Sequence, residues 1–316
     1  MSFASEVKKE LTTLIVHKEH AKAELSALIR MNGSFLLQDH QFVLKIQTEN
    51  VSILRRLFSL LKKTYNVYSE VLVHKRLNLK KNNVYIVHLK QGGSKILRDL
   101  AILDGMMFTT NVSGDIKRNA KKTKSYLRGA FLAGGSINNP KTSRYHLEIH
   151  STYEDHNQDI CEMMNYYGLN ASILERKNGY ITYLKSSEKI IDFLTLIGTV
   201  NARFKFEDVL IMRDFHNSVN RLQNAELANL NKIVDAAYHH IENIKLIESV
   251  QGLKSLPAKL IELAKMRLKY PDVSLKELGE ILPSGPLSKS GINHRMRKLN
   301  KLAKKIKKDI KNTKVE

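Results

Sequence analysis

The chain has 316 residues, and its 52 Lys and Arg outnumber its 31 Asp and Glu, which gives a formal net charge of +21 at pH 7. This excess predicts a polyanionic partner. The single cysteine, Cys161, excludes an internal disulfide framework and a Cys-rich zinc site. Neither a signal-peptide pattern nor a run of about 18 uncharged apolar residues occurs, so we expect a cytoplasmic chain that makes no use of a membrane.

Helices and hairpins alternate through the first third of the chain. Apolar residues at helical spacing predict a helix around Leu25 and further helices over 6–15, 51–63 and 94–103. Segments of strand character, joined as two hairpins by turns at 38–41 and 80–83, are predicted at 35–37, 42–47, 67–74 and 84–89.

The same order of elements recurs later in the chain. The matching positions are all displaced by 102 (127 − 25, 135 − 33, 167 − 65): Leu25 and Leu127, Gly33 and Gly135, and the segments 65–75 and 167–177. A constant displacement across helices and hairpins indicates a duplicated half-domain. We therefore predict an α+β fold with half-domains at 1–110 and 111–215, each with a four-stranded antiparallel sheet covered by helices on one face.

Two segments at equivalent places in the repeat, LSALIRMNG at 25–33 and LRGAFLAGG at 127–135, resemble the motif helices of the LAGLIDADG homing endonucleases. The resemblance implies that the two helices pack together at a pseudo-twofold axis and that the two sheets form a saddle for DNA. Ala27, Gly129 and Ala133 are small, as a close approach of two helices requires.

On this motif, the positions of the metal-holding acids of active nucleases fall on Asn32 and Gly134. Neither residue supplies the carboxylate that metal-dependent phosphodiester hydrolysis needs. Glu24 and Asp39 lie nearby in sequence, and we interpret them as ordinary solvated acids. We therefore expect no metal, no cofactor and no enzymatic activity, with Asn32 and Gly134 as degenerate nuclease positions.

A different composition follows the second repeat. A stripe of apolar residues predicts a bridging helix over 216–252. The remainder, 253–316, predicts an all-α domain with a helix-turn-helix at about 274–307 and a basic tail. Ser274 and Glu277 have the spacing of a capping box at a helix start. The final helix has an apolar stripe at Ile292, Met296, Leu299 and Ala303.

The face of the final helix opposite this stripe is polar and basic, which is typical of a recognition helix that enters the DNA major groove. Arg pairs with guanine edges, Ser and Asn reach bases, and lysines contact phosphates. We predict that DNA is contacted by Ser288, Lys289, Ser290, Asn293, His294, Arg295, Arg297, Lys298 and Lys301. Lys304 and Lys305 would follow along phosphates, and a second basic run occupies 117–124.

Along its whole length the chain is similar to the WhiA family of bacterial regulators. The matching segments include MSFASEVKKEL, LKKNNVYIV, NSVNRLQNAELANLNK and SKSGINHRMRKL. The resemblance implies a LAGLIDADG-like region without nuclease acids, followed by a helix-turn-helix. It also implies a nucleoid-associated transcription regulator that binds double-stranded DNA, works with other transcription or nucleoid proteins, and serves cell division, chromosome segregation or, in filamentous relatives, sporulation.

Two other classes of function stay open at this point. An active homing endonuclease shares the predicted fold, but Asn32 and Gly134 disfavour it. An RNA-binding or ribosome-associated protein is compatible with the net charge, whereas the recognition helix favours duplex DNA.

Overall fold

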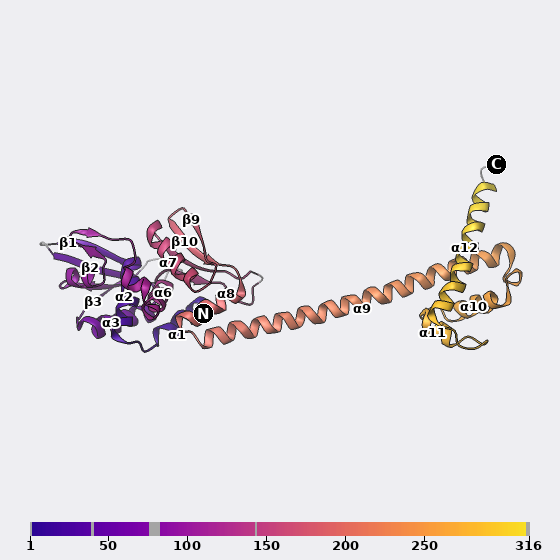
Figure 1. Cartoon of the computed structure of the whole chain (residues 1–316), viewed down its shortest axis with the longest axis horizontal. Helices are drawn as coiled ribbons and strands as arrows, with labels where there is room; N and C mark the ends of the chain where they lie inside the picture. Colours follow the sequence, from indigo (N-terminus) through magenta and orange to yellow (C-terminus); the bar gives the residue numbers. More distant parts are fainter. Residues whose placement is uncertain (1, 39–40, 76–82, 143, 314–316) are drawn as a thin grey trace. The chain divides into compact units, whose positions relative to one another are not determined.

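The computed structural model describes residues 2–38, 41–75, 83–142 and 144–313. The predicted turns at 38–41 and 80–83 lie partly outside these ranges, and Asp39 lies wholly outside them. The chain forms two compact units, residues 1–213 and 214–316 (Figure 1).

Unit 1 contains both halves of the repeat. The first half comprises α1 (Phe3–Thr12), α2 (Lys18–Asn32), β1 (Gly33–Gln38), β2 (Gln41–Thr48), α3 (Val51–Tyr65), β3 (Glu70–His74), β4 (Val84–Leu89) and α4 (Gly93–Asp99). A short connection follows, with β5 (Leu103–Asp104), β6 (Met107–Phe108) and α5 (Gly114–Arg118). The second half comprises α6 (Ala120–Gly134), β7 (Gly135–Ile137), β8 (Leu147–Ser151), α7 (Glu154–Tyr166), β9 (Ser172–Arg176), β10 (Gly179–Leu184) and α8 (Ser187–Ile197).

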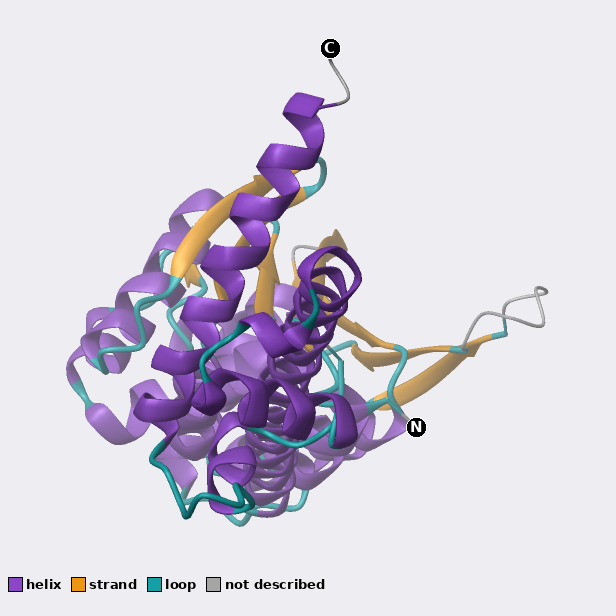
Figure 2. Ribbon diagram, turned by 90° about the vertical axis from the view of Figure 1, so that its right-hand side faces the viewer, coloured by secondary structure: helices purple, strands orange, loops and turns teal. Residues whose placement is uncertain are grey.

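Each half has one antiparallel sheet, and the two sheets have equivalent strand orders, β1-β2-β4-β3 and β7-β8-β10-β9 (strands in orange in Figure 2). Residues alternate across each sheet, so that Leu147 and Ile149 of β8 are buried while Glu148 between them is half-buried. The predicted α+β duplication with two four-stranded sheets is confirmed.

The connection between the halves differs from the prediction. The helix expected over 94–103 ends at Asp99, and Ala101 takes a left-handed conformation with φ of 50°. A non-glycine residue with positive φ cannot continue a helix. The chain then forms the small hairpin of β5 and β6, whose two-residue strands are too short to give a periodic signal.

Helices α2 and α6 pack side by side in the centre of unit 1 (Figure 1). A Cβ atom added to Gly129 of α6 would lie 2.3 Å from the carbonyl oxygen of Glu24 and 2.9 Å from Cβ of Ala27, both in α2. Such distances are below van der Waals contact, so only glycine fits at position 129. The predicted close approach of the two motif helices at Ala27 and Gly129 is confirmed.

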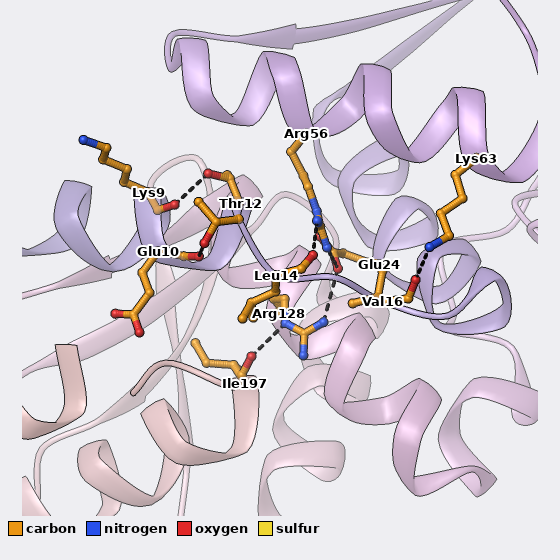
Figure 3. Close-up of polar contacts among 11 residues, drawn as sticks. Lys9, Glu10, Thr12, Leu14, Val16, Glu24, Arg56, Lys63, Arg128 and Ile197 are labelled. Atoms are coloured by element: carbon orange, nitrogen blue, oxygen red, sulfur yellow. Dashed lines mark hydrogen bonds and ion pairs between the residues drawn. The ribbon is translucent and has the colours of Figure 1, made fainter. Parts of the chain in front are cut away.

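The carboxylate of Glu24 lies between two arginines in the same interface (Figure 3). It accepts hydrogen bonds from Arg56 of α3 at 2.7 and 2.9 Å and from Arg128 of α6 at 3.3 Å. Arg56 also donates to the carbonyl of Leu14, and Arg128 to the carbonyl of Ile197. The expectation that Glu24 is a solvated acid is wrong, since its exposed fraction is 0%. This buried triad links the two halves of unit 1.

Helix α9 (Asn201–Gln251) begins well before the bridging helix predicted at 216–252. Its first N–H groups are held by Glu10 of α1, whose carboxylate accepts from the backbone of Val200, Asn201 and Ala202 at 2.7, 2.9 and 2.9 Å. A carboxylate at this place satisfies unpaired N–H groups and interacts favourably with the helix dipole. The start of α9 therefore depends on a residue about 190 positions earlier in the chain.

Unit 2 contains the end of α9, the 3-10 turn η1 (Leu253–Ser255), and helices α10 (Ala258–Lys269), α11 (Leu275–Glu280) and α12 (Lys289–Thr313). Ile244 and Ile247 of α9 are fully buried and share one apolar core with α10, α11 and α12. The boundary predicted at residue 253 thus divides this core, because the last turns of α9 belong to the same packed unit.

Replacing Glu24 by Gln keeps the shape of the side chain and removes its charge. Two buried guanidinium groups would then lack their carboxylate, and breaking a buried ion pair from one side costs about 3–5 kcal/mol. We expect Glu24→Gln to lower the free energy of unfolding of unit 1 by this amount, measured by chemical denaturation followed by circular dichroism.

The control is Asp192→Asn, which makes the same acid-to-amide change in the exposed pair with Lys189, whose atoms are 3.3 Å apart. Exposed pairs contribute about 0–1 kcal/mol, so this variant should unfold close to the wild type. Equal losses in the two variants would contradict the role assigned to the buried triad.

Candidate nucleic-acid interface

A tight turn fixes α12 against α11. The backbone N–H of Leu287 donates to the carbonyl of Gly279 at 2.9 Å, and a Cβ atom added to Gly279 would lie 2.1 Å from the carbonyl oxygen of Leu287. Position 279 therefore requires glycine for the turn to close at this distance. Gly291, in the first turn of α12, lies against the side chain of the same Leu287.

Side chains of α10 form hydrogen bonds with the turn before α11 and with the turn before α12. Arg267, which is 1% exposed, donates to the carbonyl of Val273 at 2.7 Å just before α11. Glu262 accepts from the N–H and the hydroxyl of Ser284, in the turn before α12, at 2.7 and 2.8 Å. These bonds position the final helix through its neighbours.

The capping box predicted at the start of α11 is confirmed. The hydroxyl of Ser274 accepts from the N–H of Glu277 at 3.3 Å, and the carboxylate of Glu277 accepts from the N–H of Ser274 at 2.7 Å. Backbone and side-chain hydrogen bonds to Ser274 hold the pKa of the Glu277 carboxyl below its usual value. The helix start is thus specified locally.

The predicted faces of α12 are confirmed. The apolar stripe of Ile292, Met296, Leu299 and Ala303 is fully buried in the core of unit 2. On the opposite face, within roughly one third of the helix circumference, the following predicted residues are exposed: Ser290, His294, Arg297, Lys298, Lys301, Lys304 and Lys305. This face combines hydrogen-bonding groups near the start of the helix with a row of lysines towards its end.

The other predicted contact residues occupy different environments. Ser288 and Lys289 are exposed at the start of α12, and the hydroxyl of Ser288 accepts from the N–H of Gly291 at 3.3 Å, so it acts as a helix cap. Asn293 and Arg295 are half-buried at the edges of the exposed face. Sequence periodicity places these four residues near the exposed face of α12, but it does not show how much of each side chain is accessible.

The second basic run, 117–124, is partly neutralised by residues of its own unit. Lys117 pairs with Asp159 at 2.6 Å, and Lys122 pairs with Asp115 at 2.7 Å. Lys124 lies 5.7 Å from the ring centroid of Tyr167. A lysine that is already paired contributes less to an external phosphate contact, so α12 is the stronger candidate for DNA.

The two degenerate nuclease positions meet at one cavity. Asn32 and Gly134, at the C-terminal ends of α2 and α6, both line a cavity of about 580 Å³. The motif alignment thus places equivalent positions of the two halves together. A Cβ atom added to Gly134 would lie 2.5 Å from the carbonyl oxygen of His150 and 2.7 Å from Cε of Met31, so the space for a side chain at this position is already filled.

Asn32 also lines a second, smaller cavity, together with Lys8 of α1, Thr48 and Glu49. Lys8 is half-buried, and desolvation lowers its pKa to about 8. The lining of this cavity thus contains both a basic and an acidic side chain. Among the described residues, no group of three His, Cys, Asp or Glu side chains could hold a metal ion.

The described part of the chain contains no helix that is both long and apolar enough to cross a membrane.

Three family descriptions match successive parts of the chain. Residues 18–103 match the WhiA N-terminal LAGLIDADG-like domain, residues 123–216 match the WhiA LAGLIDADG-like domain, and residues 219–303 match the WhiA C-terminal HTH domain. The last of these begins within α9, in agreement with the core that α9 shares with α10, α11 and α12.

Relatives that match nearly the whole chain belong to the same family. A protein of Enterococcus faecalis named probable cell division protein WhiA is 66% identical over 306 residues, covering 97% of this chain and 98% of the relative. One of Latilactobacillus sakei with the same name is 62% identical over 304 residues, covering 96% and 97%. The crystal structure of full-length WhiA from Thermatoga maritima has 27% identity and a TM-score of 0.61, covering 96% of this chain and 99% of that chain. The chain belongs to the WhiA family.

Proposed function

We propose that this protein is a sequence-specific regulator that binds double-stranded DNA through α12, and that its LAGLIDADG-like body has no nuclease activity. The observation that carries the proposal is the exposed face of α12, which presents His294, Arg297 and Lys301 opposite a fully buried stripe. Helices of this kind read base edges with their N-terminal part and contact phosphates beyond it.

Two features of the motif helices support the absence of nuclease activity. Asn32 and Gly134 supply no carboxylate, and the carbonyl oxygen of His150 leaves no room for a longer side chain at position 134. These features disfavour an active homing endonuclease, and the recognition-helix geometry of α12 favours duplex DNA over RNA.

The names of the relatives support a cellular role. They are called probable cell division proteins, and we propose that this protein acts in cell division and chromosome segregation as a transcription regulator associated with the nucleoid. In this proposal other transcription or nucleoid proteins act with it, and the relation to sporulation applies to filamentous members of the family.

The first test separates base reading from phosphate contact within α12. A preferred duplex is selected from a random pool, and binding isotherms are recorded against salt on this duplex and on a scrambled one. We expect Arg297→Ala to cost roughly 1–3 kcal/mol on the preferred duplex only, because Arg pairs with guanine in a bidentate manner. We expect Lys304→Ala to weaken both duplexes alike and to lower the salt slope by about one, because a phosphate contact carries no sequence information.

Met296→Ala is the control in this test. Met296 is fully buried, so its truncation should destabilise unit 2 by about 2–5 kcal/mol without changing which base pairs are preferred. An Arg297→Ala variant that weakens both duplexes equally would contradict the placement of this helix face in the major groove.

The second test divides the chain where α9 is exposed on all sides. Residues 214–235 of α9 are exposed throughout, so a cut after Asn224 leaves both apolar cores intact. We expect the fragment 225–316 to keep the sequence preference of the full chain in the same binding assay. The fragment 1–224 should melt cooperatively and bind DNA, if at all, without sequence preference. Retention of the full preference by the fragment 1–224 would assign DNA reading to the two sheets instead.

A further inference from the structure

We infer that the cavity at the ends of α2 and α6 is a binding site for a small phosphorylated ligand with a planar ring, of the size of a nucleotide. The inference goes beyond the proposed DNA binding and does not depend on it. It rests on the volume of the cavity, its charge and the types of side chain that line it.

The size and composition of the cavity suit a small molecule. Its volume of about 580 Å³ lies within the range of sites that enclose small ligands. Its described lining includes one Arg and one His but no Asp, Glu or Lys, and it also includes the hydroxyl-bearing residues Ser34, Thr109, Thr110, Ser151 and Thr152. A lining with a cation and without carboxylates favours an anion and disfavours a divalent metal.

Arg30 supplies the positive charge. This residue of α2 is 7% exposed and donates to the backbone carbonyls of Thr109 and Ala101. Within the described ranges no acid lies within ion-pair distance of its guanidinium group, and its Nε atom is buried without a hydrogen-bond partner. Buried arginines are normally paired with an anion, and a phosphate group in the cavity would supply this missing counter-charge.

Asp159, which acts electrostatically on the same residues as Arg30, already has hydrogen-bond partners of its own. Asp159 and Arg30 both influence Tyr126 and His156 electrostatically. The carboxylate of Asp159, however, accepts from Lys117 at 2.6 Å and from the N–H of Val112 at 2.5 Å. The charge of Asp159 is thus balanced by Lys117. Arg30 shares a side-chain hydrogen bond with Tyr126, and among the described residues no acid neutralises its positive charge.

Two aromatic rings form an apolar part of the cavity lining. Phe35 of β1 and Phe108 of β6 both line the cavity, and their rings are stacked with centroids 4.6 Å apart and an interplanar angle of 16°. Stacking of a planar ring on aromatic side chains is the common way in which proteins hold nucleobases. A phosphate at Arg30 and a ring at this pair would together use the charged and the apolar parts of the lining.

The repeat provides a matched pair of variants. Ser34 of β1 is exposed and lines the cavity, so Ser34→Trp should obstruct it. Ser136 of β7 is its equivalent in the second half of the repeat, is also exposed, and is absent from the cavity lining. Ser136→Trp therefore makes the same change on an equivalent strand and leaves the cavity open.

The experiment is isothermal titration calorimetry of the full chain with ribonucleoside 5′-monophosphates, the corresponding nucleosides and inorganic phosphate. We expect saturable binding of one molecule of at least one nucleotide, at least about tenfold tighter than that of its nucleoside or of phosphate, because each lacks one of the two contacts. Ser34→Trp should weaken this binding at least about tenfold, and Ser136→Trp should leave it unchanged. Thermal melting checks that both variants are folded.

Three results would overturn the inference. The first is the absence of saturable binding by every nucleotide in the series. The second is equal nucleotide binding by the two tryptophan variants, which would assign the heat to general attraction by a basic protein. The third is a loss of duplex affinity in Ser34→Trp without nucleotide binding to the wild type, which would mean that the cavity receives a phosphate of DNA. None of these results bears on the reading of bases by α12, which is tested with variants of that helix.

Discussion

The close contact of α2 with α6 determines the arrangement of unit 1. Gly129 allows the backbones to approach until a Cβ atom would collide with the carbonyl of Glu24, and the buried carboxylate of Glu24 then joins Arg56 of one half to Arg128 of the other. Because both helices end at the same level, the contact also brings Asn32 and Gly134 to one cavity. The position that holds acids in nucleases of this fold is thus retained, while its lining has no acid among the described residues.

In unit 2 the neighbouring helices fix the orientation of α12 and leave one of its faces exposed to solvent. Arg267 and Glu262 of α10 hold the turns on either side of α11, and Gly279 lets the chain turn tightly into α12. None of these residues lies on the exposed face of α12, so their replacement would disturb the helix without removing a side chain of that face. The described residues of unit 1 form a separate apolar core of their own.

Much of this structure could be predicted from the sequence because the signals are local or periodic. The duplication, the two sheets, the capping box at Ser274 and the buried stripe of α12 all follow from spacing. Features that depend on distant residues could not be predicted in this way. The partners of Glu24 lie 32 and 104 positions away, and the start of α9 depends on Glu10, about 190 positions away. The cavity likewise combines helix ends with segments near Phe108 and His150, which periodicity does not bring together.

We propose that this chain binds DNA on a nuclease-like scaffold without cutting it. The most direct measurement incubates an end-labelled preferred duplex with the full chain and Mn²⁺, and resolves the same sample on a native and on a denaturing gel. We expect a retarded complex on the native gel and strands of full length on the denaturing gel. Discrete shorter strands that appear only with Mn²⁺ and active protein would contradict the proposal.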